Sequence, residues 1–204
     1  MRSMQFENTE VFNFEGAIRG MRNPKNSWDR SEIIYDKKGN IILCDNDIKL
    51  MQTLIKAGSE HRKFMRQIFI STDVIMPAYV AQEFDTYKVG STRNSCSFQH
   101  KGTSKPFELS DFQTSPRDEG YIKLVLPILN DLRDKYLETK DYEYFLSIRR
   151  LLPMGYLYRF TWTGNYENIL NMYRQRKNHK LADWNTDFVN WVKTLPYAEE
   201  LLTI

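Results

Sequence analysis

Hydrophobic and polar residues repeat along the chain with two different periods, which predict where strands and helices lie. Residues 67–76 (QIFISTDVIM) are rich in β-branched and aromatic side chains and lack glycine and proline, which is typical of a β-strand. Residues 121–136 instead repeat apolar side chains at helical spacing, as do 141–151, 166–178 and 183–194. The pattern predicts an α+β fold, in which a small antiparallel sheet accompanies a helical half.

Shorter signals complete the first half of the chain. Two apolar runs at 33–35 and 41–44 flank a Lys-Gly-Asn turn and predict a hairpin. Asp45 or Asn46 is the predicted N-cap of a helix that runs to about Lys56 and that Gly58 closes. A proline suits the first turn of a further helix over 77–85.

No repeat, low-complexity tract or long Gly/Ser linker divides the chain, so residues 1–204 are expected to form one domain. Residues 1–30 show little periodicity and are expected to be irregular. Residues 87–114 are rich in Gly, Ser, Thr and Asn and predict a long loop. So long a loop in a compact domain is usually functional or mobile.

Composition excludes several classes of protein. The net charge of +3 is mild and its charges are mixed along the chain, so no stable nucleic-acid binding is expected. No apolar run approaches the roughly 18–20 residues of a membrane span, and the polar residues 1–13 resemble neither a signal nor a transit peptide. Two cysteines and three dispersed histidines predict no metal site. A cytoplasmic protein is therefore expected.

Two arginines fall on the apolar faces of predicted helices. Arg149 follows Tyr142 and Phe145 in one stripe, and Arg176 follows Tyr173 in another. Burying a lone charge costs several kcal/mol, so each arginine must reach solvent, meet a core carboxylate or bind an anion. Two such arginines near the same turn favour an anion or polar-ring site, because guanidinium groups suit phosphates and pyrimidine carbonyls.

Three polar residues near the second arginine have ordinary roles open to them. Asn165 begins the helix over 166–178, where capping is its simplest role. Asn171 lies on the flank of that helix with no cap to make, and His179 at its end can complement the helix dipole. None of the three specifies a ligand by itself.

The stretch 149–183 (RRLLPMGYLYRFTWTGNYENILNMYRQRKNHKLAD) resembles the C-terminal core of the flavin-dependent thymidylate synthases, the ThyX family. That family's approximate pattern is R-x-x-L-P, an aromatic-rich strand, W-T-x-N and a helix with N-x-x-x-x-R. The matching residues, in register without a gap, are Arg149, Leu152, Pro153, Trp162, Thr163, Asn165, Asn171 and Arg176. The resemblance covers a core of about residues 45–195.

Upstream the resemblance is weaker. Residues 86–100 (TYKVGSTRNSCSFQH) take the place of the family signature R-H-R-x-x-S-x-N-E-x-S-x-R-Y. Thr92, Asn94 and Ser97 fit it, whereas the R-H-R triplet falls on Thr-Tyr-Lys or, shifted by one, on Tyr-Lys-Val. The R-Y ending is replaced by Gln99 and His100.

Two further positions depart from the family. Glu83 stands where the family has a glutamine, and Glu167 stands where it has an arginine. Several positive charges near flavin or nucleotide phosphates are thus missing or moved. The chain looks like a short, divergent branch of the kind often found in bacteriophage genomes.

The resemblance implies a role for each matching residue. Arg176 is the implied catalytic residue, which binds and polarises the uracil ring. The implied substrate-binding residues are Arg149, Ser97 and Gln99. The implied cofactor-binding residues are His61, Tyr87, Lys88, Asn94, Asn165, Asn171 and His179.

The function implied by the resemblance is methylation of dUMP to dTMP by an FAD-dependent enzyme, with methylenetetrahydrofolate as carbon donor and NADPH as reductant. The family builds its site between subunits of a homotetramer. Two alternatives stay open. One is a phage flavoenzyme that modifies another pyrimidine, which Glu83 and Gln99 motivate. The other is a non-catalytic nucleotide-binding protein on the same scaffold, which the altered R-H-R segment motivates.

Overall fold

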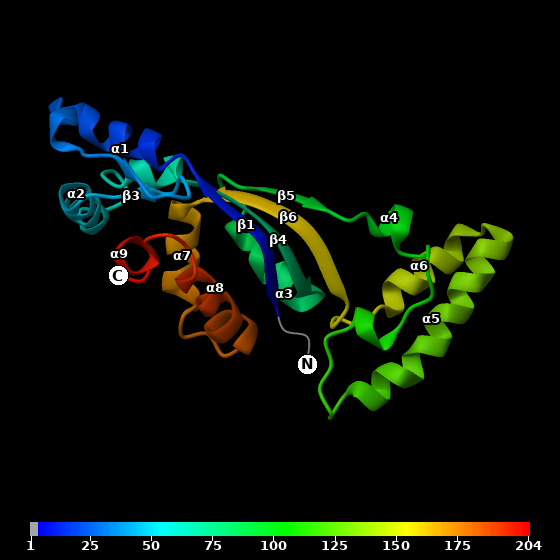
Figure 1. Ribbon diagram of the computed structural model, residues 1–204. Coiled ribbons are helices and arrows are strands. Elements are labelled where there is room, and N and C mark those ends of the chain that lie inside the picture. Colours follow the sequence, from blue (N-terminus) through cyan, green and yellow to red (C-terminus); the bar gives the residue numbers. More distant parts are fainter. Residues whose placement is uncertain (1–3) are drawn as a thin grey trace. The chain divides into compact units, whose positions relative to one another are not determined.

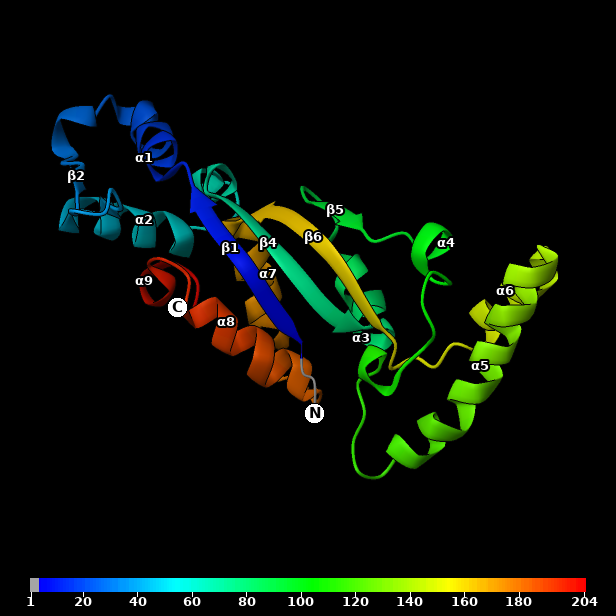
Figure 2. The same ribbon diagram turned by 45° about the vertical axis from the view of Figure 1, so that its right-hand side comes forward.

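The structure, a computed structural model, describes residues 4–204, so residues 1–3 of the predicted irregular segment lie outside it (Figure 1). Its larger sheet has four strands in the order β1-β4-β6-β5. Their bounds are Gln5–Phe12 for β1, Phe69–Pro77 for β4, Leu157–Asn165 for β6 and Thr92–Ser95 for β5. Neighbouring strands run in opposite directions (Figure 2), which confirms a mixed fold with a small antiparallel sheet.

The prediction of an irregular segment over 1–30 is wrong for β1 and for the residues that follow it. Helix α1 (Phe14–Arg22) follows β1 and buries one side; its buried apolar residues are Phe14, Ala17, Ile18 and Met21. A Cβ atom on Gly20 would lie 2.2 Å from the side-chain oxygen of Gln67, so the glycine permits this close approach. Glycine lowers helix propensity, and packing rather than local sequence therefore decides this helix.

β1 is an edge strand with few apolar residues, which explains why its pattern gave no strand signal. The Thr9 and Thr72 hydroxyl oxygens lie 2.9 Å apart, and the Thr72 hydroxyl donates to the Glu7 carbonyl oxygen at 3.1 Å. Asn8 has a φ of 50° in the middle of the strand. The extended backbone is thus interrupted at the open edge of the sheet.

The chain divides into two compact units. Unit 1 holds the described residues up to Gln5 together with Asp73–Thr86 and Arg93–Thr161. Unit 2 holds Phe6–Thr72, Tyr87–Thr92 and Trp162–Ile204. The expectation of a single domain over residues 1–204 stays a prediction.

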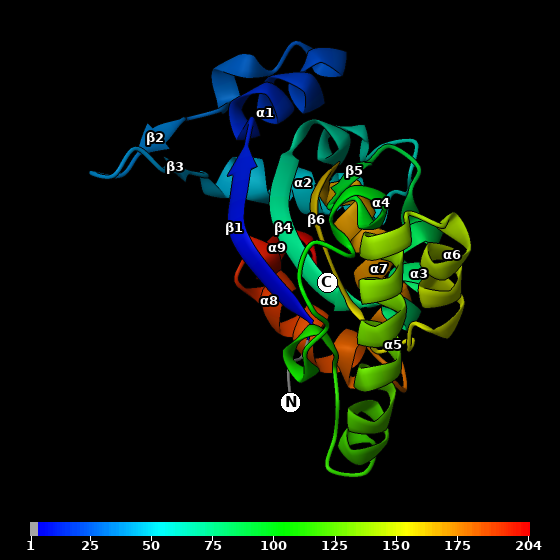
Figure 3. The ribbon, with the colours of Figure 1, turned by 90° about the vertical axis from the view of Figure 1, so that its right-hand side faces the viewer.

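Unit 1 is built around a helical hairpin. Its helices are α3 (Ala78–Phe84), α4 (Phe98–Lys101), α5 (Glu119–Thr139) and α6 (Tyr142–Leu151). A short 3-10 turn, η5, spans Leu109–Asp111, and another, η4, spans Asp85–Tyr87 at the end of the unit. Helices α5 and α6 lie side by side (Figure 3). Their shared core comprises Phe98, Phe107, Phe112, Leu129, Phe145 and Ile148.

The predicted helices over 77–85, 121–136 and 141–151 are confirmed by α3, α5 and α6. The predicted loop over 87–114 is wrong in part, because it contains β5, α4 and η5. Its aromatic residues bury against the helical hairpin, a tertiary contact that its polar composition concealed.

Unit 2 begins with α1 and two 3-10 turns, η1 (Asn23–Lys25) and η2 (Trp28–Arg30). The strands β2 (Ile34–Tyr35) and β3 (Ile41–Ile42) pair antiparallel, which confirms the predicted hairpin. Helix α2 (Asp45–Lys56) confirms the predicted helix over 45–56, and the turn η3 (Lys63–Gln67) leads into β4.

The rest of unit 2 is helical. It comprises α7 (Tyr166–Arg176), a π-helical turn η6 (Asp183–Phe188), α8 (Val189–Lys193) and α9 (Ala198–Leu201). Large apolar side chains are fully buried here, among them Trp162, Tyr166, Trp184 and Phe188. None of the helices within residues 4–204 combines the length and the hydropathy that a membrane span requires.

Candidate functional site

One face of α7 is polar and lies against the segment 87–90. Asn168, Asn171 and Gln175 are spaced three and four residues apart, so they share a side of the helix. The Asn168 amide nitrogen donates to the Val89 carbonyl oxygen at 2.8 Å, and the Tyr87 hydroxyl donates to the Gln175 side-chain oxygen at 3.2 Å. The altered signature segment is therefore held along the helix that carries the strongest family-like motif.

Arg176 lies at the end of α7 between two aromatic rings. Its Nε donates to the Tyr87 hydroxyl oxygen at 2.7 Å. Its guanidinium carbon lies 4.8 Å from the ring centre of Trp184 and 5.4 Å from that of Tyr87. Because Trp184 is fully buried, it gives the half-buried guanidinium a rigid aromatic support. The charge of Arg176 is thus held in a defined orientation.

A nearly buried ion pair joins the loop before η3 to α7. The Nε of Arg62 lies 3.0 and 2.8 Å from the two carboxylate oxygens of Glu167. The exposed fractions of the two side chains are only 12% and 9%. The Nη2 of Arg62 also donates to the side-chain oxygen of Asn171 in a longer contact of 3.5 Å. Arg62 has no local signal in the sequence, because its partner Glu167 is 105 residues away.

Asn165 caps α7. Its side-chain oxygen accepts from the Asn168 backbone nitrogen at 3.0 Å, and the Asn168 side-chain oxygen accepts from the Asn165 backbone nitrogen at 3.1 Å. This reciprocal arrangement satisfies two backbone donors at the helix start. The capping role of Asn165 is confirmed, whereas its contact with a flavin stays a prediction.

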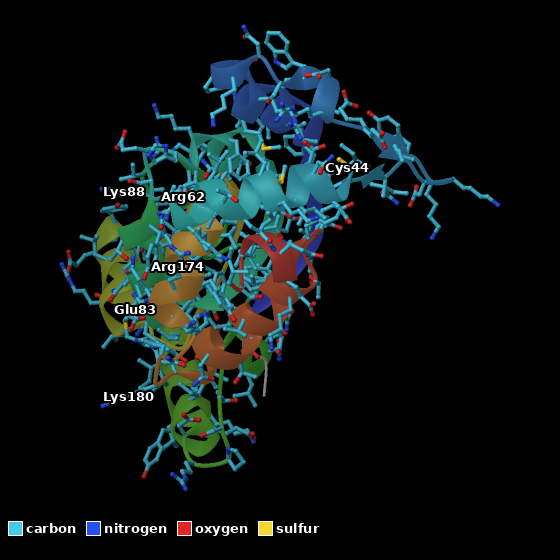
Figure 4. All side chains as sticks on the ribbon, turned by 90° about the vertical axis from the view of Figure 1, so that its left-hand side faces the viewer. Cys44, Arg62, Glu83, Lys88, Arg174 and Lys180 are labelled. Carbon is cyan, nitrogen blue, oxygen red and sulfur yellow. The ribbon has the colours of Figure 1, made fainter. Side chains whose placement is uncertain are left out.

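The other predicted cofactor-binding residues of unit 2 include His61, His179 and Lys88. His61 is exposed and directly precedes Arg62. His179 is half-buried, and its Nδ1 accepts from the Leu181 backbone nitrogen at 3.3 Å. Lys88 is exposed. Figure 4 labels the cations Arg62, Lys88, Arg174 and Lys180, all of unit 2.

The predicted substrate-binding residues meet in unit 1. Ser97 and Gln99 flank Phe98 in sequence, and the guanidinium carbon of Arg149 lies 5.3 Å from the Phe98 ring centre. All three predicted residues are exposed. Unit 1 also contains Asn94, which is exposed on β5. The structure therefore brings the predicted substrate-binding residues together, but these residues and Asn94 belong to a different unit from Arg176.

A small cavity of about 160 Å³ lies beside Ser97 and Phe98. Lys101, Tyr156 and Arg159 also line it. Burial raises the pKa of Tyr156 to about 12, and the nearby charge of Asp111 adds to the shift. The cavity therefore presents a neutral phenol together with two cationic side chains.

The prediction that Arg149 continues the apolar stripe of its helix is wrong, and of the alternatives left open for its side chain the one that reaches solvent is found. The buried residues of α6 are Phe145 and Ile148. The apolar stripe thus continues from Phe145 to Ile148, three residues later, and Arg149 lies beside the stripe in solvent. The neighbouring Arg150 is exposed as well and forms an ion pair with Glu143.

The site in unit 2 combines cationic and amide donors with aromatic rings. Such a combination suits a planar ligand that is rich in hydrogen-bond acceptors and carries negative charge. Among residues 4–204, no group of three or more His, Cys, Asp or Glu side chains is arranged to hold a metal ion.

Comparisons with known proteins give a likeness of fold. No protein-family model matches the sequence, and no curated protein matches it. A solved structure of thymidylate synthase X (ThyX) from Helicobacter pylori with FAD and dUMP matches with a TM-score of 0.71 and 15% identity, covering 98% of this chain and 97% of that chain. A second structure, of flavin-dependent thymidylate synthase ThyX from the same bacterium complexed with FAD and dUMP, matches with a TM-score of 0.71 and 14% identity, covering 97% of each chain. The fold is therefore similar to that of ThyX over nearly the whole chain.

Proposed function

We propose that this protein is a flavin-dependent thymidylate synthase-like enzyme that methylates dUMP to dTMP. The observation that carries the proposal is the placement of Arg176, which Tyr87 and Trp184 fix at the end of the polar face of α7. This arrangement occurs in a fold similar to two structures that contain FAD and dUMP.

The residues of unit 2 fit a flavin nucleotide. Asn171, His61, Lys88 and His179 offer donors around α7, and the loss of the R-H-R triplet leaves Lys88 as a cation in that segment. FAD, when bound and reduced by NADPH, supplies the electrons that reduce the transferred carbon. Methylenetetrahydrofolate donates that carbon. The fixed cation of Arg176 stabilises negative charge that develops on the oxygens of the uracil ring.

The residues of unit 1 fit the nucleotide substrate. Arg149 provides a cation for the dUMP phosphate, and Ser97 and Gln99 provide uncharged donors beside it. We propose a homotetramer with sites between subunits. An apolar stripe on α5 supports this assembly, because Tyr121, Leu124 and Ile128 are 71%, 70% and 52% exposed.

The test begins with the purified protein and added FAD. Flavin absorbance bands should persist through gel filtration, and the loaded protein should form dTMP from dUMP, methylenetetrahydrofolate and NADPH. Arg176→Ala should abolish turnover. A protein that cannot be loaded at millimolar FAD contradicts the proposal.

A second candidate keeps the chemistry and changes the base. Gln99 replaces a cation on α4, and Glu83 places an acid on α3 where the family has an amide. A panel of pyrimidine nucleotides in the turnover assay separates the two candidates. A non-catalytic nucleotide-binding protein would bind dUMP without turnover, and Arg176→Ala would then only weaken binding.

A further inference from the structure

We propose that Arg62 and Glu167 are positioning residues, which orient the Asn171 amide so that its nitrogen donates to a neutral acceptor atom of the flavin nucleotide. The proposal rests on the proposed function, in which unit 2 holds the flavin. Of Arg62, Glu167 and Asn171, the resemblance implies a flavin contact for Asn171 alone, and the family has an arginine where this chain has Glu167.

The chemistry of arginine fixes which end of the amide faces it. A guanidinium group carries only donors, so the Asn171 atom that lies 3.5 Å from the Arg62 Nη2 must be the oxygen. The amide nitrogen then points to the other side of the Asn171 side chain. Since Asn171 is half-buried, that nitrogen can reach a ligand.

The ion pair holds the guanidinium in place. Glu167 and Asn171 lie four residues apart on the same side of α7, so one guanidinium contacts both. Arg62 engages both Glu167 oxygens, and the two side chains are nearly buried. A lysine would lack the planar fork that permits this shared contact.

The pair also determines the kind of atom that Asn171 meets. The Asn171 amide is itself an uncharged N–H donor. Because the charge of Glu167 cancels that of Arg62, no net positive charge lies behind this donor. A neutral donor suits a ring carbonyl or ring nitrogen, whereas a phosphate is better met by a cation. The expected contact is therefore with a ring of the flavin nucleotide and not with its pyrophosphate.

The decisive variant exchanges the two acceptor groups around Arg62. In Glu167→Gln/Asn171→Asp, the guanidinium still meets one carboxylate and one amide oxygen, but position 171 has lost its donor. We expect a thermal midpoint within about 3 °C of the wild type and an FAD dissociation constant raised about tenfold, the effect of one lost hydrogen bond. FAD affinity unchanged in this variant would show that the Asn171 nitrogen does not contact the flavin nucleotide, whereas the role of the pair itself is tested with Asn171 intact.

A second variant covers the case in which the exchange does not fold. Arg62→Gln/Glu167→Gln removes both charges together, so no buried charge is left unpaired. The Asn171 amide is then free to turn, and FAD affinity should fall about fivefold although Asn171 is intact. The matched control is Arg174→Gln, which removes an exposed cation from the same helix and should change affinity less than twofold.

The outcomes separate the two proposals. An FAD affinity within twofold of the wild type in either folded double variant overturns the positioning role. A wild-type protein that binds no FAD overturns the proposed function. In that case the thermal midpoint of Glu167→Gln/Asn171→Asp still tests whether Arg62 contacts both side chains. A midpoint more than about 10 °C below that of the wild type contradicts this shared contact.

Discussion

The Tyr87 hydroxyl oxygen accepts a hydrogen bond from the Nε of Arg176 at 2.7 Å, across 89 residues of sequence. Tyr87 lies in the segment that replaces the family's R-H-R triplet, where a second arginine would repel Arg176. A phenol oxygen instead accepts from Arg176, and its ring faces the guanidinium. The predicted contact between Tyr87 and the flavin is still untested.

Tyr87→Phe keeps the ring and removes the acceptor. We expect kcat with dUMP to fall about tenfold, because the loss of one charge-assisted hydrogen bond of about 1.4 kcal/mol leaves Arg176 less well oriented. The dissociation constant for FAD should change less than threefold. Tyr121→Phe is the matched control, since Tyr121 is 71% exposed on α5. A Tyr87→Phe enzyme with wild-type kcat contradicts this role.

Arg149→Ala tests the proposed substrate-binding role of the residues of unit 1. Arg149 is exposed and its guanidinium carbon lies 5.3 Å from the ring centre of Phe98, so its removal should lower the free energy of unfolding by no more than about 1 kcal/mol. The KM for dUMP should rise at least tenfold through loss of a phosphate contact. Arg150→Ala removes the next cation along α6 and should leave KM unchanged. Equal effects of the two substitutions would show that only the overall charge matters.

Gly164→Ala tests the packing of the W-T-G-N motif. A Cβ atom at Gly164 would lie 2.4 Å from the Trp162 ring, which is buried and cannot move aside. The substitution should lower the free energy of unfolding by about 1–3 kcal/mol in urea titrations. Gly120→Ala is the control: a Cβ atom there meets nothing within 4 Å, and alanine should stabilise α5 by about 0.5–1 kcal/mol.

Tyr156→Phe tests the pH dependence of stability. The pKa of Tyr156 is raised from 10.0 to about 12, chiefly by burial, so the folded state holds the phenolic proton more tightly than the unfolded chain does. The stability that this contributes is complete below pH 10 and is lost as the pH rises from about 10 to about 12. We expect the free energy of unfolding of the wild type to fall over this range, and that of Tyr156→Phe to fall less steeply. Parallel pH curves would contradict the shift.

Most of the helices follow from the sequence because each carries a regular apolar face. Helix α2, for example, ends at Lys56 as predicted, and it begins at Asp45, within two residues of the predicted start. β1 and α1 were missed because neither has a local signal: β1 is a polar edge strand, and α1 contains Gly16 and Gly20. Both depend on packing partners that are distant in sequence.

Residues of the candidate site were predictable only where a side chain of suitable chemistry also occupied a position of the family-like motif. Arg176 and Asn171 stand in a family-like motif, and both lie on α7 in unit 2. Arg149 was misplaced because adjacent helix positions differ by about 100° in direction, and the apolar stripe passes through Ile148. Arg62 and Trp184 had no sequence signal, since a lone arginine and an aromatic residue in a helix have ordinary structural explanations.

The left-handed backbone of Asn8 has a consequence for the protein in concentrated solution. Strand addition at an open sheet edge needs peptide groups at regular spacing, and amyloid-like growth proceeds in this way. In β1 a residue with a φ of 50° turns its peptide groups out of that spacing, halfway along the strand. A foreign strand can therefore match only a short stretch on either side of Asn8, and the β1 edge is a poor template for fibril growth.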